Sequence, residues 1–112
     1  MPVIPYKNRS ETGIIKTEDI CYIERDYDYR RLHVFCDGRE GVTIRIKTDE
    51  LRGYLDNDFV WLTRSLIVNL RRVERVSKQY VYFENGSIYL TYKQYLKLKK
   101  YYEKFLAKNY AI

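Results

Sequence analysis

The sequence predicts a mostly β fold, with small antiparallel sheets, one short internal helix and a C-terminal amphipathic helix. Strand-forming residues dominate, with 13 Tyr among the aromatic residues, and Pro and Gly are scarce. Short runs of alternating polarity recur in the first half of the chain, whereas the residues near the C terminus repeat with helical spacing. Because 112 residues suffice for one modest core, we expect a single domain over residues 1–112.

The first half should consist of short strands separated by charged or glycine-containing turns. The expected strands are 3–7, 13–17, 19–26, 29–36 and 41–47. Alternation is clearest in "VTIRIK", where residues 42, 44 and 46 are apolar and residues 43, 45 and 47 are polar. One face of that sheet should therefore be exposed to solvent.

A short helix should interrupt the strands after residue 47. Thr48 can cap its N terminus, and Asp49 and Glu50 complement the positive end of the helix dipole. Leu51, Tyr54 and Leu55 form its apolar stripe. Strands then resume at 59–62, 72–79, 80–84 and 87–91, and Asn85-Gly86 should supply the positive-φ pair of a two-residue hairpin.

Residues 92–110 predict an amphipathic helix. Its apolar positions, at helical spacing, are Tyr95, Leu98, Tyr102 and Phe105, and its lysine face comprises Lys93, Lys97, Lys100 and Lys104. A solvated outer face accounts for the lysines beyond the first turn. Lys93 differs, because a side chain at the start of a helix lies beside the preceding loop.

The charge balance favours a partner that carries phosphates. Lys and Arg number 21 against 15 Asp and Glu, a net charge of +6, although charge alone is weak evidence. The single histidine, His33, has no partners at the spacing of a general base or a metal site. Glycine-rich phosphate loops and nucleophile elbows are missing from the sequence. We therefore predict no enzyme, no cofactor or metal, and no small-molecule substrate.

The cysteines and the hydropathy pattern predict a soluble cytoplasmic protein without a membrane partner. Cys21 and Cys36 lack metal-cluster spacing and follow no signal sequence, so buried thiols are favoured. A disulfide between them stays open if they lie on paired strands. No apolar run approaches the roughly 20 residues of a membrane span.

Isolated cationic and polar residues stand at the expected strand ends: Arg30-Arg31, Arg64-Ser65 and Thr91-Tyr92-Lys93. Arginine can donate two hydrogen bonds to guanine O6 and N7, and hydroxyl groups bind phosphates. Such residues could converge on one face, although solvated strand ends also carry Arg and Ser.

The segment "FVWLTRSLIVNLRRV" resembles the signature of the LytTR-type DNA-binding domain. That family has an aromatic residue, then His-Arg-Ser or a close variant, an aliphatic triplet and Asn. Phe59, Arg64-Ser65, Ile67-Val68 and Asn69 match, and Thr63 stands at the His position. "EDICYIE" and "YFENGSIYLTYKQY" resemble an early strand and the last hairpin of the family. The resemblance covers nearly the whole chain.

The resemblance implies sequence-specific binding of double-stranded DNA in bacterial transcription regulation. The domain would be the effector of a two-component response regulator or a stand-alone regulator, with loops in successive major grooves of promoter direct repeats. Base contacts would come from Arg30, Arg64 and Lys93. Phosphate-contacting or positioning residues would be Thr63, Ser65, Thr91, Tyr92, Gln94 and Lys97. Whether two domains pair as a homodimer on DNA stays open.

Several alternatives remain open at this point. A LytTR-fold protein-interaction module that regulates another transcription factor without binding DNA would also suit a tyrosine-rich surface. The early-loop contact could fall on Arg31 instead of Arg30. Asn69 should satisfy local backbone groups, and Trp61 and Leu62 should belong to the core.

Overall fold

The computed structural model describes residues 2–26 and 31–112. Within them the elements follow the order β1 (Val3–Lys7), β2 (Thr12–Lys16), η1 (Thr17–Asp19), β3 (Ile20–Arg25), β4 (Arg31–Cys36), β5 (Val42–Arg45), α1 (Thr48–Tyr54), β6 (Phe59–Thr63), β7 (Leu66–Asn69), η2 (Leu70–Arg72), β8 (Arg75–Val76), β9 (Tyr80–Phe83), β10 (Gly86–Tyr89) and α2 (Tyr92–Tyr110). This mostly β layout with two α-helices confirms the expected fold class.

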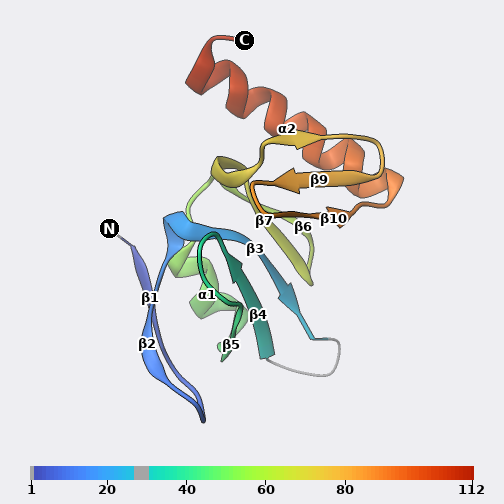
Figure 1. Ribbon diagram of the computed structural model, residues 1–112. Helices are drawn as coiled ribbons and strands as arrows, with labels where there is room; N and C mark the ends of the chain where they lie inside the picture. The colour runs from blue at the N-terminus through green and yellow to red at the C-terminus, as the bar shows by residue number, and fades with distance from the viewer. Residues whose placement is uncertain (1, 27–30) are drawn as a thin grey trace.

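A five-stranded antiparallel sheet of order β5-β4-β3-β7-β6 forms the centre of the described structure. The β1–β2 hairpin and α1 lie beside one part of it, and the β10-β9-β8 sheet with α2 lies at the other (Figure 1). Alternate residues of the central strands therefore enter two different cores. Phe59 of β6 joins the first core and its neighbour Val60 joins the second.

The first core lies between the central sheet, the N-terminal hairpin and α1. Ile4 of β1, Ile15 of β2 and Leu51 of α1 are fully buried there with Ile23 of β3. Tyr54 and Leu55 pack against the same cluster, which confirms the apolar stripe expected for the short helix. Val42 and Ile44 of β5 are buried as well, whereas Arg45 is exposed, as the alternation indicated.

The second core lies under α2. Leu98 is fully buried, and Tyr95, Tyr102 and Phe105 pack around it against the central and C-terminal sheets. The helical spacing read from the sequence is thus confirmed over the whole of α2. Since both cores share the central sheet, the two layers hold the ends of its strands in fixed positions.

Three local expectations are wrong. Thr48 is the first residue of α1, and Lys47 is the N-cap without a side-chain bond, because Lys47 keeps an extended backbone and its carbonyl accepts from Leu51 N at 2.9 Å. The β9–β10 hairpin pairs Phe83 with Gly86, so Glu84-Asn85 forms the turn and neither Asn85 nor Gly86 has positive φ. The strand expected at 72–79 shrinks to β8, because η2 takes its first residue and a turn closed by the bond from Ser77 N to Tyr80 O takes its last ones.

The two cysteines carry free thiols, Cys21 buried and Cys36 partly buried. Burial raises the pKa of Cys21 to about 12, and a hydrogen bond from its Sγ to Asp37 Oδ1 at 3.1 Å adds to the effect. Burial raises the pKa of Cys36 to about 11.

At pH 8 both thiols should therefore react with iodoacetamide more than about a hundredfold slower than an exposed thiol, because only the thiolate attacks and an ordinary thiol pKa is near 8.5. Mass spectrometry of the folded and the denatured protein would measure this. Both cysteines should be alkylated rapidly once the chain is unfolded. Equal rates in the two states would contradict the burial.

Within residues 2–26 and 31–112, no helix has both the length and the apolar character needed to cross a membrane.

Candidate nucleic-acid interface

Antiparallel pairing places one end of each of the five central strands side by side, and these strand ends form the rim at one end of the sheet. Arg25 at the end of β3 pairs with Leu32, and Arg31 at the start of β4 pairs with Arg45 at the end of β5. Thr63 at the end of β6 pairs with the start of β7, so the turn with Arg64 lies at the same edge. We call the set Arg25, Arg31, Arg45 and Arg64 the basic edge. With a strand spacing of ~4.8 Å, it extends over roughly 19 Å.

Two arginines at the opposite end of the sheet are neutralised by carboxylates, whereas Arg39 of the β4–β5 turn donates to Ile14 O and to the Tyr6 hydroxyl. Arg71 bonds Asp56 and Asp58 at 2.6 and 2.8 Å. Arg72 reaches Asp19 at 3.1 Å and Asp37 at 3.2 Å. These ion pairs have a structural role, because each guanidinium already has an anionic partner.

The basic edge is different. Among the described residues, Arg25, Arg45 and Arg64 form no ion pair, and only Arg31 has one, at 3.5 Å to Asp26. Uncompensated cations on one edge create a positive potential that attracts anions. This contrast between the two ends of one sheet marks the edge as a candidate interface.

The turn that carries Arg64 is built rigidly. An extra residue in β6 shifts the pairing between Trp61 and Thr63, and such a bulge redirects the chain. Thr63 Oγ1 then accepts from Ser65 N at 3.0 Å, and Ser65 O accepts from Arg25 N at 2.9 Å. The following Ile67 is buried, so the turn is fixed from both sides while the Arg64 side chain stays exposed.

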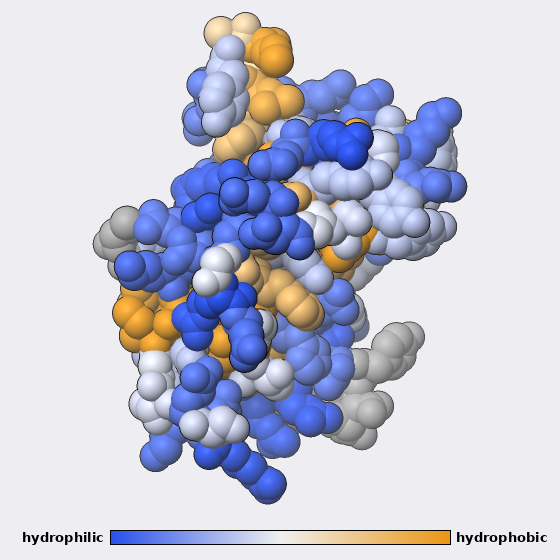
Figure 2. All heavy atoms as spheres, viewed as in Figure 1, coloured by the Kyte–Doolittle hydropathy of each residue, from blue (hydrophilic) through white to orange (hydrophobic). Residues whose placement is uncertain are grey.

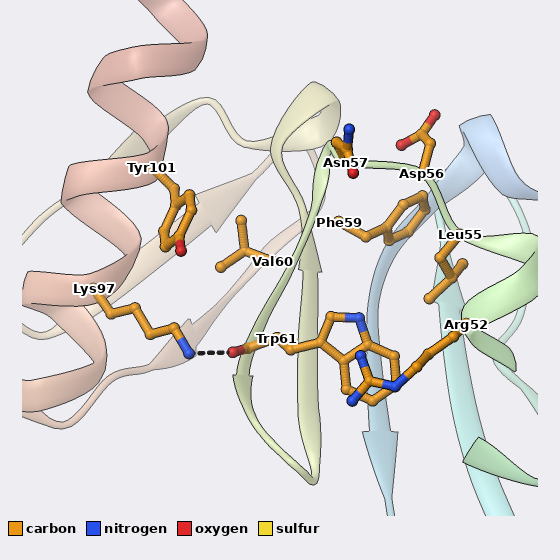
Figure 3. A pocket seen from close by; sticks show the side chains of 9 residues that line it. All are labelled: Arg52, Leu55, Asp56, Asn57, Phe59, Val60, Trp61, Lys97 and Tyr101. Atoms are coloured by element: carbon orange, nitrogen blue, oxygen red, sulfur yellow. Dashed lines mark hydrogen bonds between the residues drawn. The ribbon is translucent and has the colours of Figure 1, made fainter. Parts of the chain in front are cut away.

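A hollow of about 360 Å³ lies beside this turn. Within residues 2–26 and 31–112, its lining consists of Arg25, Thr48, Arg52, Trp61 and Arg64, none of which is a carboxylate. The Arg52 guanidinium lies 4.2 Å from the centre of the Trp61 ring (Figure 3), a cation–π contact that holds the charge in place. Arg25 Nη2 is buried without a hydrogen-bond partner among the described residues.

A second hollow, of about 510 Å³, lies beyond the same Arg52–Trp61 pair (Figure 3). Its lining includes Asp56, the carboxylate that already pairs with Arg71. The mixed charge makes this side a poorer place for a phosphate than the hollow at Arg64. Trp61 is half-buried between the two, so the expectation of a core position is only partly met, whereas Leu62 is buried as expected.

The start of α2 lies at the same end of the molecule as the Arg64 turn. Lys97 Nζ donates to Trp61 O at 2.6 Å, and Figure 3 shows Tyr101 farther along, near Val60. The helix therefore runs antiparallel to β6. Lys93 lies one helical turn before Lys97, a rise of about 6 Å, and is exposed on the side toward the Arg64 turn.

The remaining candidate residues divide by what they already bond. Thr91 and Gln94 form a capping box, with Gln94 N donating to Thr91 Oγ1 at 3.2 Å and Thr91 N donating to Gln94 Oε1 at 3.0 Å. Both side-chain oxygens accept from backbone N–H groups, and these bonds fix the start of α2. Lys97 is likewise held by a backbone carbonyl, and Tyr92 is exposed. All four stay predictions as phosphate contacts.

Arg30 lies outside the described residues, so its role as a base contact stays a prediction. Arg31, the alternative one residue later, belongs to the basic edge. Asn69 is fully buried, donates to Ile20 O at 2.8 Å and accepts from Arg71 N at 3.1 Å, which confirms its role in satisfying the backbone.

The residues of the basic edge and its hollow that sequence reasoning missed are Arg25, Arg45 and Arg52. Arg25 ends the run "ICYIER", so the rule that selected the other strand-end arginines could have found it. Arg52 offered no such signal, because its meeting with Trp61 depends on how α1 docks onto the sheet.

Three of the four arginines of the basic edge form no ion pair with a described residue, and a small β domain with such a row of cations has the layout of a domain that binds a polyanion. The family model described as the LytTr DNA-binding domain matches residues 10–107, and the chain belongs to this family. The structure is similar to the LytTr DNA-binding domain of a Bacillus cereus protein described as a methyl-accepting/DNA response regulator, with a TM-score of 0.70. That comparison covers 92% of this chain and 97% of the other at 16% sequence identity. Among curated proteins no match is found.

Proposed function

We propose that the chain binds double-stranded DNA in a sequence-specific manner as the DNA-binding part of a bacterial transcription regulator. The observation that carries the proposal is the contrast between Arg71 and Arg72, which pair with carboxylates at one end of the sheet, and the basic edge at the other, where three of the four arginines form no ion pair with a described residue. Membership of the LytTr DNA-binding domain family supports the choice of DNA among polyanions.

Arg64 is the residue we assign to base reading in the major groove. Its turn is held by the Thr63 and Arg25 hydrogen bonds, so little conformational entropy is lost when the guanidinium binds a base edge. The planar guanidinium matches guanine O6 and N7 with two hydrogen bonds. Lys93 at the start of α2 would contact a second site, and Arg30 a third.

Arg25 and Arg52 would hold phosphates on either side of Arg64. Both line the same hollow as Arg64, and the stack of Arg52 on Trp61 keeps its charge directed outward. Phosphate contacts of this kind fix the register of a protein on DNA without reading sequence. Ser65 would add a neutral contact beside them.

In the regulator we envisage, two such domains occupy direct repeats in a promoter, and an associated receiver domain of a two-component system controls their pairing. The protein would act in the cytoplasm. These features rest on the family resemblance, since the described residues include no second copy and no receiver.

Selection from a library of randomised duplexes tests the proposal. The wild-type domain should enrich one short motif, and its affinity for that motif should fall with salt at a log–log slope of about −4 to −6, as for about four to seven phosphate contacts. Binding without enrichment would leave only a basic surface. No binding to any duplex of the library would favour a protein-interaction module of the same fold.

A further inference from the structure

A second basic groove adjoins the basic edge on the side away from α2. It has a volume of about 720 Å³ and lies between the turn of the β1–β2 hairpin and the ends of β4 and β5. Its charged lining among the described residues consists of Lys7, Arg9, Arg31 and Arg45, without a carboxylate. The hairpin turn stands at the bottom of Figure 1, and Figure 2 shows this end of the molecule as strongly hydrophilic.

The cations of this groove crowd one another. Arg31 and Arg45 are directly opposite in the β4–β5 register, and like charges at such positions destabilise a sheet. Asp26 relieves only Arg31, at 3.5 Å. Glu11, the nearest carboxylate in the hairpin, accepts a hydrogen bond from Tyr6 at 2.7 Å instead of pairing with a cation. An external anion would remove the repulsion.

The hairpin turn is fixed over the groove by one side chain. Asn8 Oδ1 accepts from the backbone N of Ser10 and of Glu11, both at 2.9 Å, which shapes the turn. Its Nδ2 donates to Thr43 O at 3.1 Å, which ties the turn to β5. Lys7 and Arg9, on either side of Asn8, are therefore held in position beside Arg45.

We propose that this groove binds the phosphate backbone of the same DNA duplex, on one flank of the sequence read by Arg64. The inference rests on the proposed function and extends it. Arg31 and Arg45 belong both to the groove and to the basic edge, so a duplex lying along the edge continues into the groove. Lys7 and Arg9 precede residues 10–107, so these contacts come from outside the segment that the family model matches.

The test compares two double variants of equal charge. Arg9→Gln/Arg45→Gln removes two cations from the groove, and Lys104→Gln/Lys108→Gln removes two exposed cations from the distal part of α2. Each is measured with the selected motif in a short duplex and in duplexes extended by about five base pairs, half a helical turn, on either flank. Melting temperatures confirm that each variant is folded.

The wild type should gain roughly tenfold in affinity from extension on one flank only. Arg9→Gln/Arg45→Gln should lose this gain and lower the salt slope by about two, one for each phosphate contact, whereas the α2 variant should keep both. Asn8→Ala, which changes no charge, should lose part of the flank gain because the hairpin turn is released from β5.

Equal flank gains and equal salt slopes in the wild type and Arg9→Gln/Arg45→Gln would overturn the inference while leaving motif selection, and thus the proposed function, intact. Should the wild type select no motif, the proposed function fails. Salt dependence of binding to random duplexes then tests the groove by itself. A salt slope that is lower in Arg9→Gln/Arg45→Gln than in the wild type and the α2 variant would support phosphate binding in the groove, and equal slopes in all three proteins would overturn it.

Discussion

Replacing Arg64 with alanine should abolish the preference for one base pair of the selected motif, at a cost of about 1–3 kcal/mol in binding free energy on that sequence. The side chain is exposed at the basic edge, and its turn is held by backbone and Thr63 bonds that do not involve the guanidinium. The fold should therefore survive. Competition binding to the motif and to its single-base-pair variants measures the change.

Lys104→Ala is the matched control, because it also removes one exposed cation but lies far along α2. It should weaken binding little and leave every base preference unchanged. If Arg64→Ala weakens binding equally on the motif and on random duplexes, Arg64 contacts phosphate and the base-reading role is wrong. The position at which preference disappears would also identify the base pair that faces the turn.

Leu98→Ala should reduce the free energy of unfolding by about 2–5 kcal/mol, because it leaves a cavity at a fully buried position where α2 packs into the second core. Chemical unfolding monitored by circular dichroism measures this loss. Leu96→Ala on the same helix is the control, since Leu96 is 48% exposed and its truncation should cost less than about 0.5 kcal/mol.

Under conditions where Leu98→Ala remains folded, its affinity for the motif should also decrease, because Lys93 and the cap of α2 depend on the docking of the helix. A loss of stability similar to that of Leu96→Ala would show that the second core does not hold α2 as described.

The parts of the fold that the sequence predicts are those set by local periodicity. The strands at 3–7 and 31–36 and the helix at 92–110 appear at or close to the expected bounds, because alternation and helical spacing directly reflect which face is buried. The short helix and the last hairpin were predicted in place but with incorrect ends. The exact end of such an element depends on the backbone conformation of a single residue, here Lys47 before α1 and Asn85 in the hairpin turn.

The candidate site depends on long-range pairing, which local patterns do not contain. The sequence indicated Arg64 through its position before an aliphatic triplet, and Asn69 through the chemistry of its amide. It did not indicate that Arg25, Arg31, Arg45 and Arg64 share one edge, because this follows from the strand order β5-β4-β3-β7-β6. Nor did it distinguish paired from unpaired arginines, since the ion pairs of Arg71 and Arg72 join residues far apart in the chain.

The separation of paired and unpaired arginines along the strands gives the domain an electric dipole. Asp19, Asp37, Asp56 and Asp58 gather around Arg71 and Arg72 of η2, and the arginines that have no ion pair with a described residue at the other end are Arg25, Arg45 and Arg64. A polyanion should therefore orient the approaching domain before any contact forms. Encounters would begin with the Arg64 turn already facing the duplex, so fewer collisions are lost to wrong orientations and the search for a binding site is faster.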